Sequence, residues 1–252
     1  MKTQNASDIF RDALDKLYES HLPSKHPFFK HLAAFPTEKF HSPALLGELY
    51  RRYQAAMHAT RVMVYHLPYL DNISLRSRKL KILIDDDGLQ GGDTHHSQLS
   101  CAFAHIGAEL GMEDDQFGNL DELKKSLDPM TSNFVSLVQE LYPKSLGAWC
   151  IVEMLSNDWM IALMRGLAVH FPSIKNEPYF AECFAQGIED QHAQESLALT
   201  SIVLAHSPEL LEQTIEGART MAVALDNFWS GLENLLTESG DRTLQQGCIS
   251  KT

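Results

Sequence analysis

Residues 146–170 read LGAWCIVEMLSNDWMIALMRGLAVH, and this stretch decides the fold class. Its apolar residues recur at three- and four-residue spacing, which indicates a buried α-helix rather than a strand. The same spacing continues along most of the chain, and strand signals are nearly absent. We therefore predict an all-α protein, built as an up-and-down bundle of long helices joined by short polar turns.

Further helices are predicted on both sides of this stretch, with prolines and polar residues marking their ends. The predicted helices cover residues 6–20, 28–35, 43–66, 73–84, 96–110, 120–127, 129–141, 146–170, 178–206 and 208–236. The break IDDDGLQGGDTHH (84–96) is not taken as a domain boundary, because the apolar face of the next helix needs partners on both sides. We expect a single domain over 1–236 and a flexible polar tail over 237–252.

Composition excludes several classes of protein. The chain carries a net charge of -12, so it lacks the basic stripe that neutralises phosphates, and we expect no nucleic-acid partner. The start MKTQNASDIF has no apolar signal core, and no apolar run approaches the ~18 residues of a membrane span. A soluble cytoplasmic protein with no membrane contact is expected, and base rates for small enzymes favour a homodimer. The four cysteines form no CxxC pair and are expected to be buried, reduced thiols.

Glu189 and His192, in GIEDQHAQES (187–196), are candidate metal ligands. Residues three apart share a helix face, and the same face extends to Glu182, Ala185 and Ser196. A carboxylate and an imidazole on one inward face form the arrangement with which helix bundles hold iron or manganese. An isolated Glu-x-x-His pair also occurs on solvated faces, and that alternative stays open here.

Glu153 lies in the apolar stretch 146–170, where its periodic neighbours include Trp149 and Met160. Burying a carboxylate without a partner costs several kcal/mol, so Glu153 should have one. A metal ion, Arg165 or a buried histidine could each serve. A buried acid in an apolar setting strengthens the metal hypothesis for Glu189 and His192.

Asp86 and His96 flank the acidic break in the chain. Asp86 would lie at the end of one helix and His96 at the start of the next, where a bundle often opens its cavity. A polar loop with a capping aspartate and a surface histidine is the alternative interpretation.

Taken in order along the chain, these motifs resemble the haem-oxygenase-like di-iron oxidases, the group that includes the chlamydial death-domain-associating protein and the alkene-forming fatty acid decarboxylases. The resemblance covers most of the chain and rests on HPFFKHLAAF (26–35), IDDDGLQGGDTHHSQLSCAFAHIGAELGM (84–112), Glu153 and YFAECFAQGIEDQHAQ (179–194). In these proteins an acidic, glycine-containing loop precedes a His-x-x-Leu, here His96 and Leu99. The resemblance implies a haem-oxygenase-like helical bundle.

The resemblance also implies a set of iron ligands. They are Asp86, His96, Glu153, Glu189 and His192, with Asp87 and His95 as alternatives for the first two. The family's last ligands form a His-x3-Asp-x2-His run, which here begins at Ala185. Glu189 in place of Asp changes reach but not chemistry, whereas Ala185 cannot bind metal. The implied cofactor is Fe(II), as two ions with one weaker site, unless Glu182 or a water replaces the missing ligand.

The implied function is that of an oxidoreductase, a non-haem iron oxidase or oxygenase that activates O2 on a small molecule. Amino acids, fatty acids and aromatic precursors are the substrates of such enzymes. Glu153 and His192 would be the catalytic residues, while Arg61 and Arg165 could hold a substrate carboxylate.

Two other classes of function are considered. A metal-free relative, similar to thiaminase-like and pyrroloquinoline-quinone-synthase-like proteins, would bind an organic heterocycle in the same cavity. Glu153, His96 and His192 would then act as acids, bases or hydrogen-bonding groups. A non-catalytic interaction protein is allowed by the acidic surface, but it leaves the burial of Glu153 unexplained, and a cavity filled with aliphatic side chains would favour it.

Overall fold

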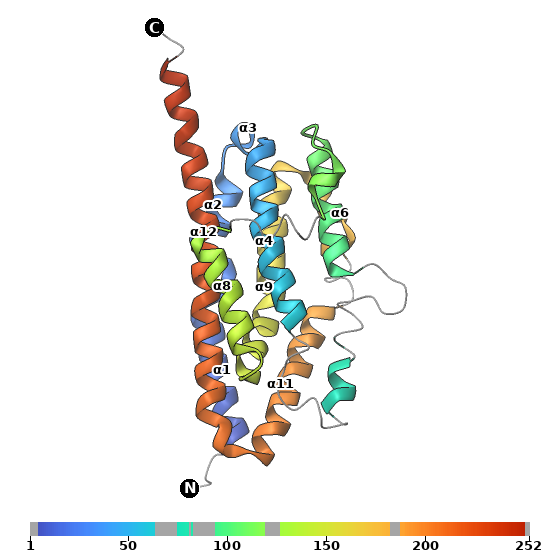
Figure 1. Ribbon diagram of the computed structural model, residues 1–252, viewed down its shortest axis with the longest axis vertical. Coiled ribbons are helices and arrows are strands. Elements are labelled where there is room, and N and C mark those ends of the chain that lie inside the picture. Colours follow the sequence, from blue (N-terminus) through green and yellow to red (C-terminus); the bar gives the residue numbers. More distant parts are fainter. Residues whose placement is uncertain are drawn as a thin grey trace.

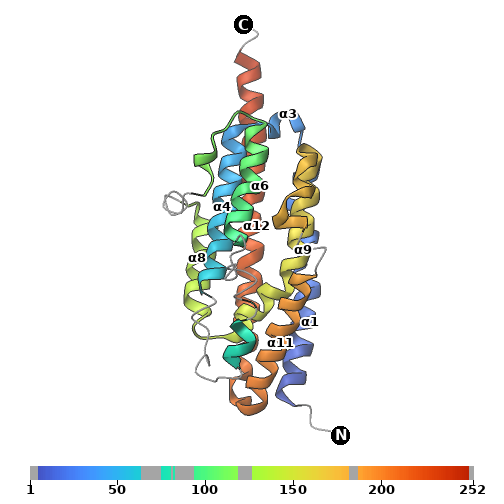
Figure 2. The ribbon, with the colours of Figure 1, turned by 90° about the vertical axis from the view of Figure 1, so that its right-hand side faces the viewer.

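The computed structural model describes residues 5–63, 75–80, 82, 94–118, 127–181 and 187–249, with the backbone alone described from 241 onward. Within these ranges the chain forms helices and their connections, and no strand occurs among them. Figures 1 and 2 show the long helices running up and down along one axis. The predicted all-α bundle is confirmed.

Seven long helices of the described chain make up most of the bundle: α1 (Ala6–Ser20), α4 (Pro43–Met63), α6 (His95–Ala108), α8 (Pro129–Leu141), α9 (Leu146–His170), α11 (Ile188–His206) and α12 (Leu211–Ile249). Shorter elements are α2 (Pro27–Ala34), α3 (Thr37–Phe40) and 3-10 turns at Pro23–Lys25, Asp114–Gln116, Pro172–Asn176 and Pro208–Leu210. The bounds of α1, α8 and α9 are the predicted ones. The predicted helix 120–127 and the end of the predicted helix 43–66 lie outside the described residues, except for Leu127.

Helix α9 lies at the centre of the core and packs against α12, α11 and α2. Trp149, Leu155 and Leu163 on this helix are fully buried, as expected of a helix that is apolar on all sides. Gly147 lies where α9 meets α12, and a Cβ there would come within 1.8 Å of the Thr214 carbonyl oxygen. Glycine therefore permits the closest approach between these two helices.

The single helix predicted over 178–206 is wrong at Gly187. This residue has φ of 61°, in the left-handed region, and α11 begins only after it, at Ile188. Left-handed backbone favours glycine, and glycine inside a helix costs about 1 kcal/mol relative to alanine. The break places Glu189 in the first turn of a new helix, where the helix dipole favours a negative charge.

The segment from Thr237, predicted to be a flexible polar tail, continues α12 to Ile249. Figures 1 and 2 show this end of α12 projecting past the other helices. Extending a formed helix needs no new nucleation, so polar residues can continue it. Near the start of this segment, the Gly240 carbonyl oxygen accepts a hydrogen bond from Lys39 Nζ at 3.2 Å. No described helix has the combination of length and apolar character that crossing a membrane requires.

Candidate metal centre

Two helices bring three of the predicted ligands together: Glu153 from α9, and Glu189 and His192 from α11. One donor atom of each residue lies within 4.8 Å of the donor atoms of the other two. Glu189 is 5% exposed and His192 is 2% exposed. Among the described residues, no other group of three His, Cys, Asp or Glu side chains converges in this way. We refer to these three residues as the metal cluster.

The shared helix face predicted for α11 explains why Glu189 and His192, two of the three cluster residues, lie together. Glu189, His192 and Ser196 follow one another at three- and four-residue spacing, and all three are buried. Ser196 contacts α9 directly, because its hydroxyl donates to the Cys150 sulfur at 3.6 Å. The same face therefore brings Glu189 and His192 against Glu153.

The two oxygens of Glu153 face different partners. Oε1 accepts a hydrogen bond from Trp149 Nε1 at 2.6 Å, one helical turn earlier on α9. Oε2 lies 3.9 Å from His192 Nδ1, which is longer than a hydrogen bond. The carboxylate is thus held on one side and directed toward the cluster on the other.

A cavity of about 40 Å³ adjoins the cluster. Figure 1 shows the C-terminal end of α4 and the N-terminal ends of α6 and α11 meeting beside α9, and the cavity lies there. Thr60, Arg61, His95 and Tyr179 line it together with the cluster. A water needs ~10–15 Å³ of such space, so the cavity has room for about three waters. A cavity filled with aliphatic side chains would have favoured an interaction protein. This cavity has open space and polar residues in its wall.

The structure directs His95, rather than His96, into this cavity. Thr94 caps α6 by accepting a hydrogen bond from Ser97 N at 3.0 Å, so both histidines lie in the first turn. Consecutive helical residues point about 100° apart, since 3.6 residues make a turn. His95 is 4% exposed and lines the cavity.

His96 instead faces α4. Its Nδ1 accepts a hydrogen bond from Gln54, and its ring lies 5.5 Å from the ring of His58. Burial lowers the pKa of His96, and the nearby His58 and Arg61 lower it further. His96 as the metal ligand from this helix stays a prediction, and its alternative His95 is the one of the two histidines that lines the cavity.

Of the two arginines considered for substrate binding, Arg61 lies at the cavity and Arg165 does not. Arg61 lines the cavity, with its guanidinium carbon 6.0 Å from the centre of the Tyr179 ring. Arg165 is exposed on α9, twelve residues beyond Glu153, or ~18 Å along the helix. Arg165 is therefore neither a partner of Glu153 nor a cavity residue. Asp86, Asp87, Glu182 and Ala185 lie outside the described residues, so their predicted roles are untested.

From the sequence, Trp149 was considered only as an apolar neighbour of Glu153, and Lys79 was given no role. Trp149 is fully buried, but its indole N–H bonds Glu153, and the spacing of four residues between them was a usable signal. Lys79 is 1% exposed, and its ammonium lies 4.1 Å from the centre of the Trp149 ring. No sequence pattern could have revealed that contact, because it joins segments far apart in the chain.

The donor chemistry of the cluster fits a first-row divalent metal. Carboxylate oxygens with an imidazole nitrogen suit Fe(II) or Mn(II). Ligand bonds of ~2.0–2.2 Å place opposite donors up to ~4.3 Å apart, so the 4.8 Å spread requires only a small contraction. Burial raises the pKa of the nearby Cys150 thiol to about 12, and no cysteine belongs to the cluster.

In comparisons with known proteins, no protein-family model matches the chain. No curated protein matches it significantly either. The relation to haem-oxygenase-like di-iron oxidases stays a resemblance.

Proposed function

We propose that the protein is a non-haem iron oxidase or oxygenase with a haem-oxygenase-like fold, acting on a small molecule with O2. Glu153, Glu189 and His192 would hold Fe(II). The observation that carries the proposal is the convergence of the buried Glu189 and His192 with the partly buried Glu153, whose side chain is 13% exposed, beside a cavity. We also propose that the enzyme is cytoplasmic and forms a homodimer. Light scattering after size-exclusion chromatography would measure its oligomeric state.

Iron is favoured because the donors are oxygen and nitrogen, with no thiolate among them. Held by these residues, Fe(II) would supply the electrons that reduce O2. His95 lines the same cavity and is the described residue best placed to add a further nitrogen donor. The expected content is two ions, with the second bound more weakly.

The protein's own residues would bind the substrate and manage protons. The Arg61 guanidinium on the cavity wall offers a positive charge to an anionic group of a substrate. In protein without bound metal, His192 Nδ1 and Glu153 Oε2 lie 3.9 Å apart and are a pair between which a proton can pass, whereas in the iron-bound site both residues would serve as ligands. Burial of the cluster excludes bulk water from this pair.

Anaerobic loading with Fe(II) tests the proposal. We expect wild-type protein to retain iron at micromolar free metal and to develop an O2-dependent absorbance, and Glu189→Gln to do neither. Glu177→Gln is the matched control, because Glu177 is also a buried glutamate beside a histidine, with its oxygens 3.0 Å from His105 Nδ1. Failure of wild-type protein to bind iron at micromolar concentration contradicts the proposal.

A metal-free enzyme or binding protein for an organic heterocycle is the second candidate. It is supported by the carboxylate–imidazole pair of Glu153 and His192 and by two aromatic residues on the cavity wall, Trp159 and Tyr179. Glu153→Gln distinguishes the two functions. It abolishes iron uptake if the protein is an iron enzyme, whereas a metal-free protein takes up no iron in either form and keeps its fold.

A further inference from the structure

A buried lysine, Lys79, contacts Trp149, which hydrogen-bonds to Glu153 of the metal cluster. Lys79, from the helical segment 75–80, is 1% exposed, and its ammonium is 4.1 Å from the centre of the Trp149 indole. A fully buried lysine is rare, because removing its charge from water is unfavourable. The negative face of an indole ring attracts a cation at this distance, and the attraction is larger where water is absent.

The same indole contacts the metal cluster through its edge. Trp149 Nε1 donates to Glu153 Oε1 at 2.6 Å, a short hydrogen bond to a carboxylate oxygen. A cation on the ring face withdraws electron density from the indole and makes its N–H a stronger donor. The Lys79 ammonium therefore polarises the Trp149 indole, and the indole N–H in turn binds the Glu153 carboxylate more strongly.

We propose that Trp149 and Lys79 are positioning residues for Glu153, with the lysine strengthening the hydrogen bond by which the tryptophan holds Oε1. Because Oε1 is engaged by Trp149, Oε2 is the oxygen that faces His192. The carboxylate is then oriented before any ligand binds, and orienting partners of this kind tune the affinity of a site. The metal part of this inference rests on the proposed function, while the hydrogen bond itself can be tested without metal.

Binding of Co(II), a spectroscopic probe for the site, measures the effect on affinity. Trp149→Phe keeps a ring under the ammonium but removes the N–H, and Lys79→Met keeps the aliphatic stem but removes the charge. Trp229→Phe is the control, because Trp229 is equally buried and its Nε1 has no hydrogen-bond partner among the described residues.

We expect Trp149→Phe to weaken Co(II) binding about 10–100-fold and to shift the visible absorption bands, as loss of an orienting partner does. Lys79→Met should weaken binding about threefold, less than the full value of a desolvated cation–π contact, because the lysine acts on Glu153 only through the indole. Trp229→Phe should change the affinity less than about twofold, since it removes a similar packing contact but no hydrogen bond to a ligand. Equal effects of the two tryptophan variants would mean that Trp149 acts through packing alone, which overturns the proposal.

The indole N–H resonances test the hydrogen bond in metal-free protein. The chain has three tryptophans, so three indole signals are expected and each is assigned by its Trp→Phe variant. The Trp149 signal should lie downfield and move upfield in Glu153→Gln and in Lys79→Met. An unchanged signal in both variants overturns the positioning role, whatever the metal result. If wild-type protein binds no Co(II) and the signal still moves as expected, the proposed function fails and the positioning of Glu153 stands.

Discussion

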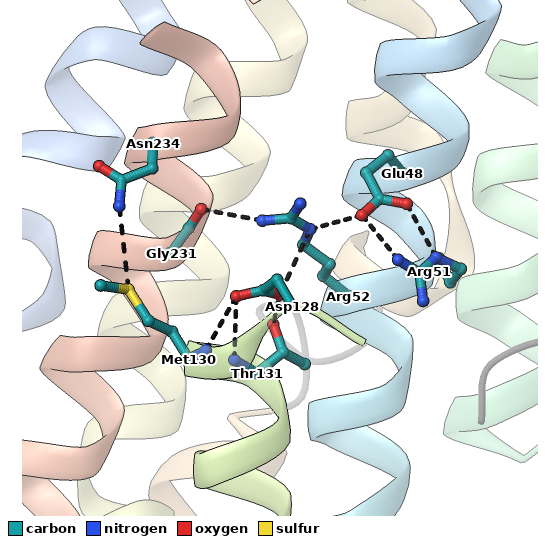
Figure 3. Close-up of polar contacts among 8 residues, drawn as sticks. All are labelled: Glu48, Arg51, Arg52, Asp128, Met130, Thr131, Gly231 and Asn234. Carbon is teal, nitrogen blue, oxygen red and sulfur yellow. Dashed lines mark hydrogen bonds and ion pairs between the residues drawn. The ribbon is translucent and has the colours of Figure 1, made fainter. Parts of the chain in front are cut away.

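Two clusters of charged side chains lie in the same bundle and are built in opposite ways. In the first, which we call the arginine cluster, Glu48, Arg51 and Arg52 on α4 meet Asp128 at the start of α8 (Figure 3). Glu48 accepts hydrogen bonds from both guanidiniums at 2.7–2.8 Å, and Arg52 lies 3.4 Å from Asp128. Arg52 also donates to the Gly231 carbonyl of α12 at 3.1 Å, so the cluster joins three helices.

The metal cluster, by comparison, holds two carboxylates and one imidazole around a cavity. Within it, His192 Nδ1 and Glu153 Oε2 are 3.9 Å apart, well beyond the 2.7 Å that separates the Glu48 oxygens from the guanidiniums. Acids matched by close guanidiniums stabilise a helix junction, because every charge is neutralised within the fold. Acids grouped beside a cavity lower stability through mutual repulsion, and such groups are typical of sites where a ligand provides the balance.

Replacing Glu48 by Gln should have the largest effect, because it removes the negative charge shared by two guanidiniums and replaces one acceptor oxygen by an NH2 group, which leaves Asp128 as the acid of the cluster. We expect the free energy of unfolding to fall by about 3 kcal/mol, near the lower end for breaking a buried pair, since the side chains are partly exposed. Urea denaturation measures it. A loss below about 1 kcal/mol, as for a surface pair, would remove the contrast between the clusters.

The same acid-to-amide change in the metal cluster should act in the opposite direction. In metal-free protein, Glu189→Gln should raise the free energy of unfolding by about 0.5–1 kcal/mol, as substitutions at functional sites often do. In the wild type, metal at 100 times its Kd should add about 2.7 kcal/mol, and this gain should vanish in Glu189→Gln. Thermal melts with and without Mn(II) measure both effects. Destabilisation of the metal-free variant would show that Glu189 is architectural instead.

Acid should remove the contribution of the arginine cluster. Burial raises the pKa of Glu48, but hydrogen bonds and charges from Arg51 and Arg52 outweigh it, and the pKa lies below its usual value. A lowered folded-state pKa means that the stabilisation is present above the unfolded pKa near 4.5 and is lost as pH falls through the folded value. The stability difference between wild type and Glu48→Gln should therefore be constant from pH 7 to 5 and shrink as the pH falls below 4.5. A difference that is independent of pH down to pH 3 would contradict this account.

The smallest effect is expected at an exposed ion pair. Glu216 and Arg219 on α12 contact each other, but their side chains are 63% and 56% exposed. Glu216→Gln should change the free energy of unfolding by less than about 0.5 kcal/mol, and salt should reduce even that. A larger loss would mean that charge pairing on the surface, rather than burial, explains the effect of Glu48→Gln.

Local patterns predicted the helices well and their interruptions poorly. Apolar spacing and terminal prolines defined α1, α8 and α9, because each helix signals its own ends. Gly187 was missed, because a glycine inside an amphipathic pattern is compatible with a helix until packing selects the left-handed conformation. The continuation of α12 beyond Thr237 was missed because a polar composition alone does not end a helix.

The candidate site divides in the same way. Glu189 and His192 could be paired from their spacing on one helix, and Glu153 could be suspected from its apolar neighbours. The choice between His95 and His96 could not be made, because adjacent residues differ only in direction and that direction depends on how α6 packs against α4. The same limit applies to Arg165, whose exposure depends on the rotation of α9 within the bundle.

By itself, the sequence determined the all-α class, the periodic faces of the helices and the residues able to bind a metal, since these depend on composition and local spacing. Tertiary structure alone decided that Glu153 meets Glu189 and His192 at a cavity, that His95 lines it, and that Lys79 lies on Trp149. These contacts join residues from separate helices. Their positions follow from the rotation and approach of those helices, which only packing of the whole core determines.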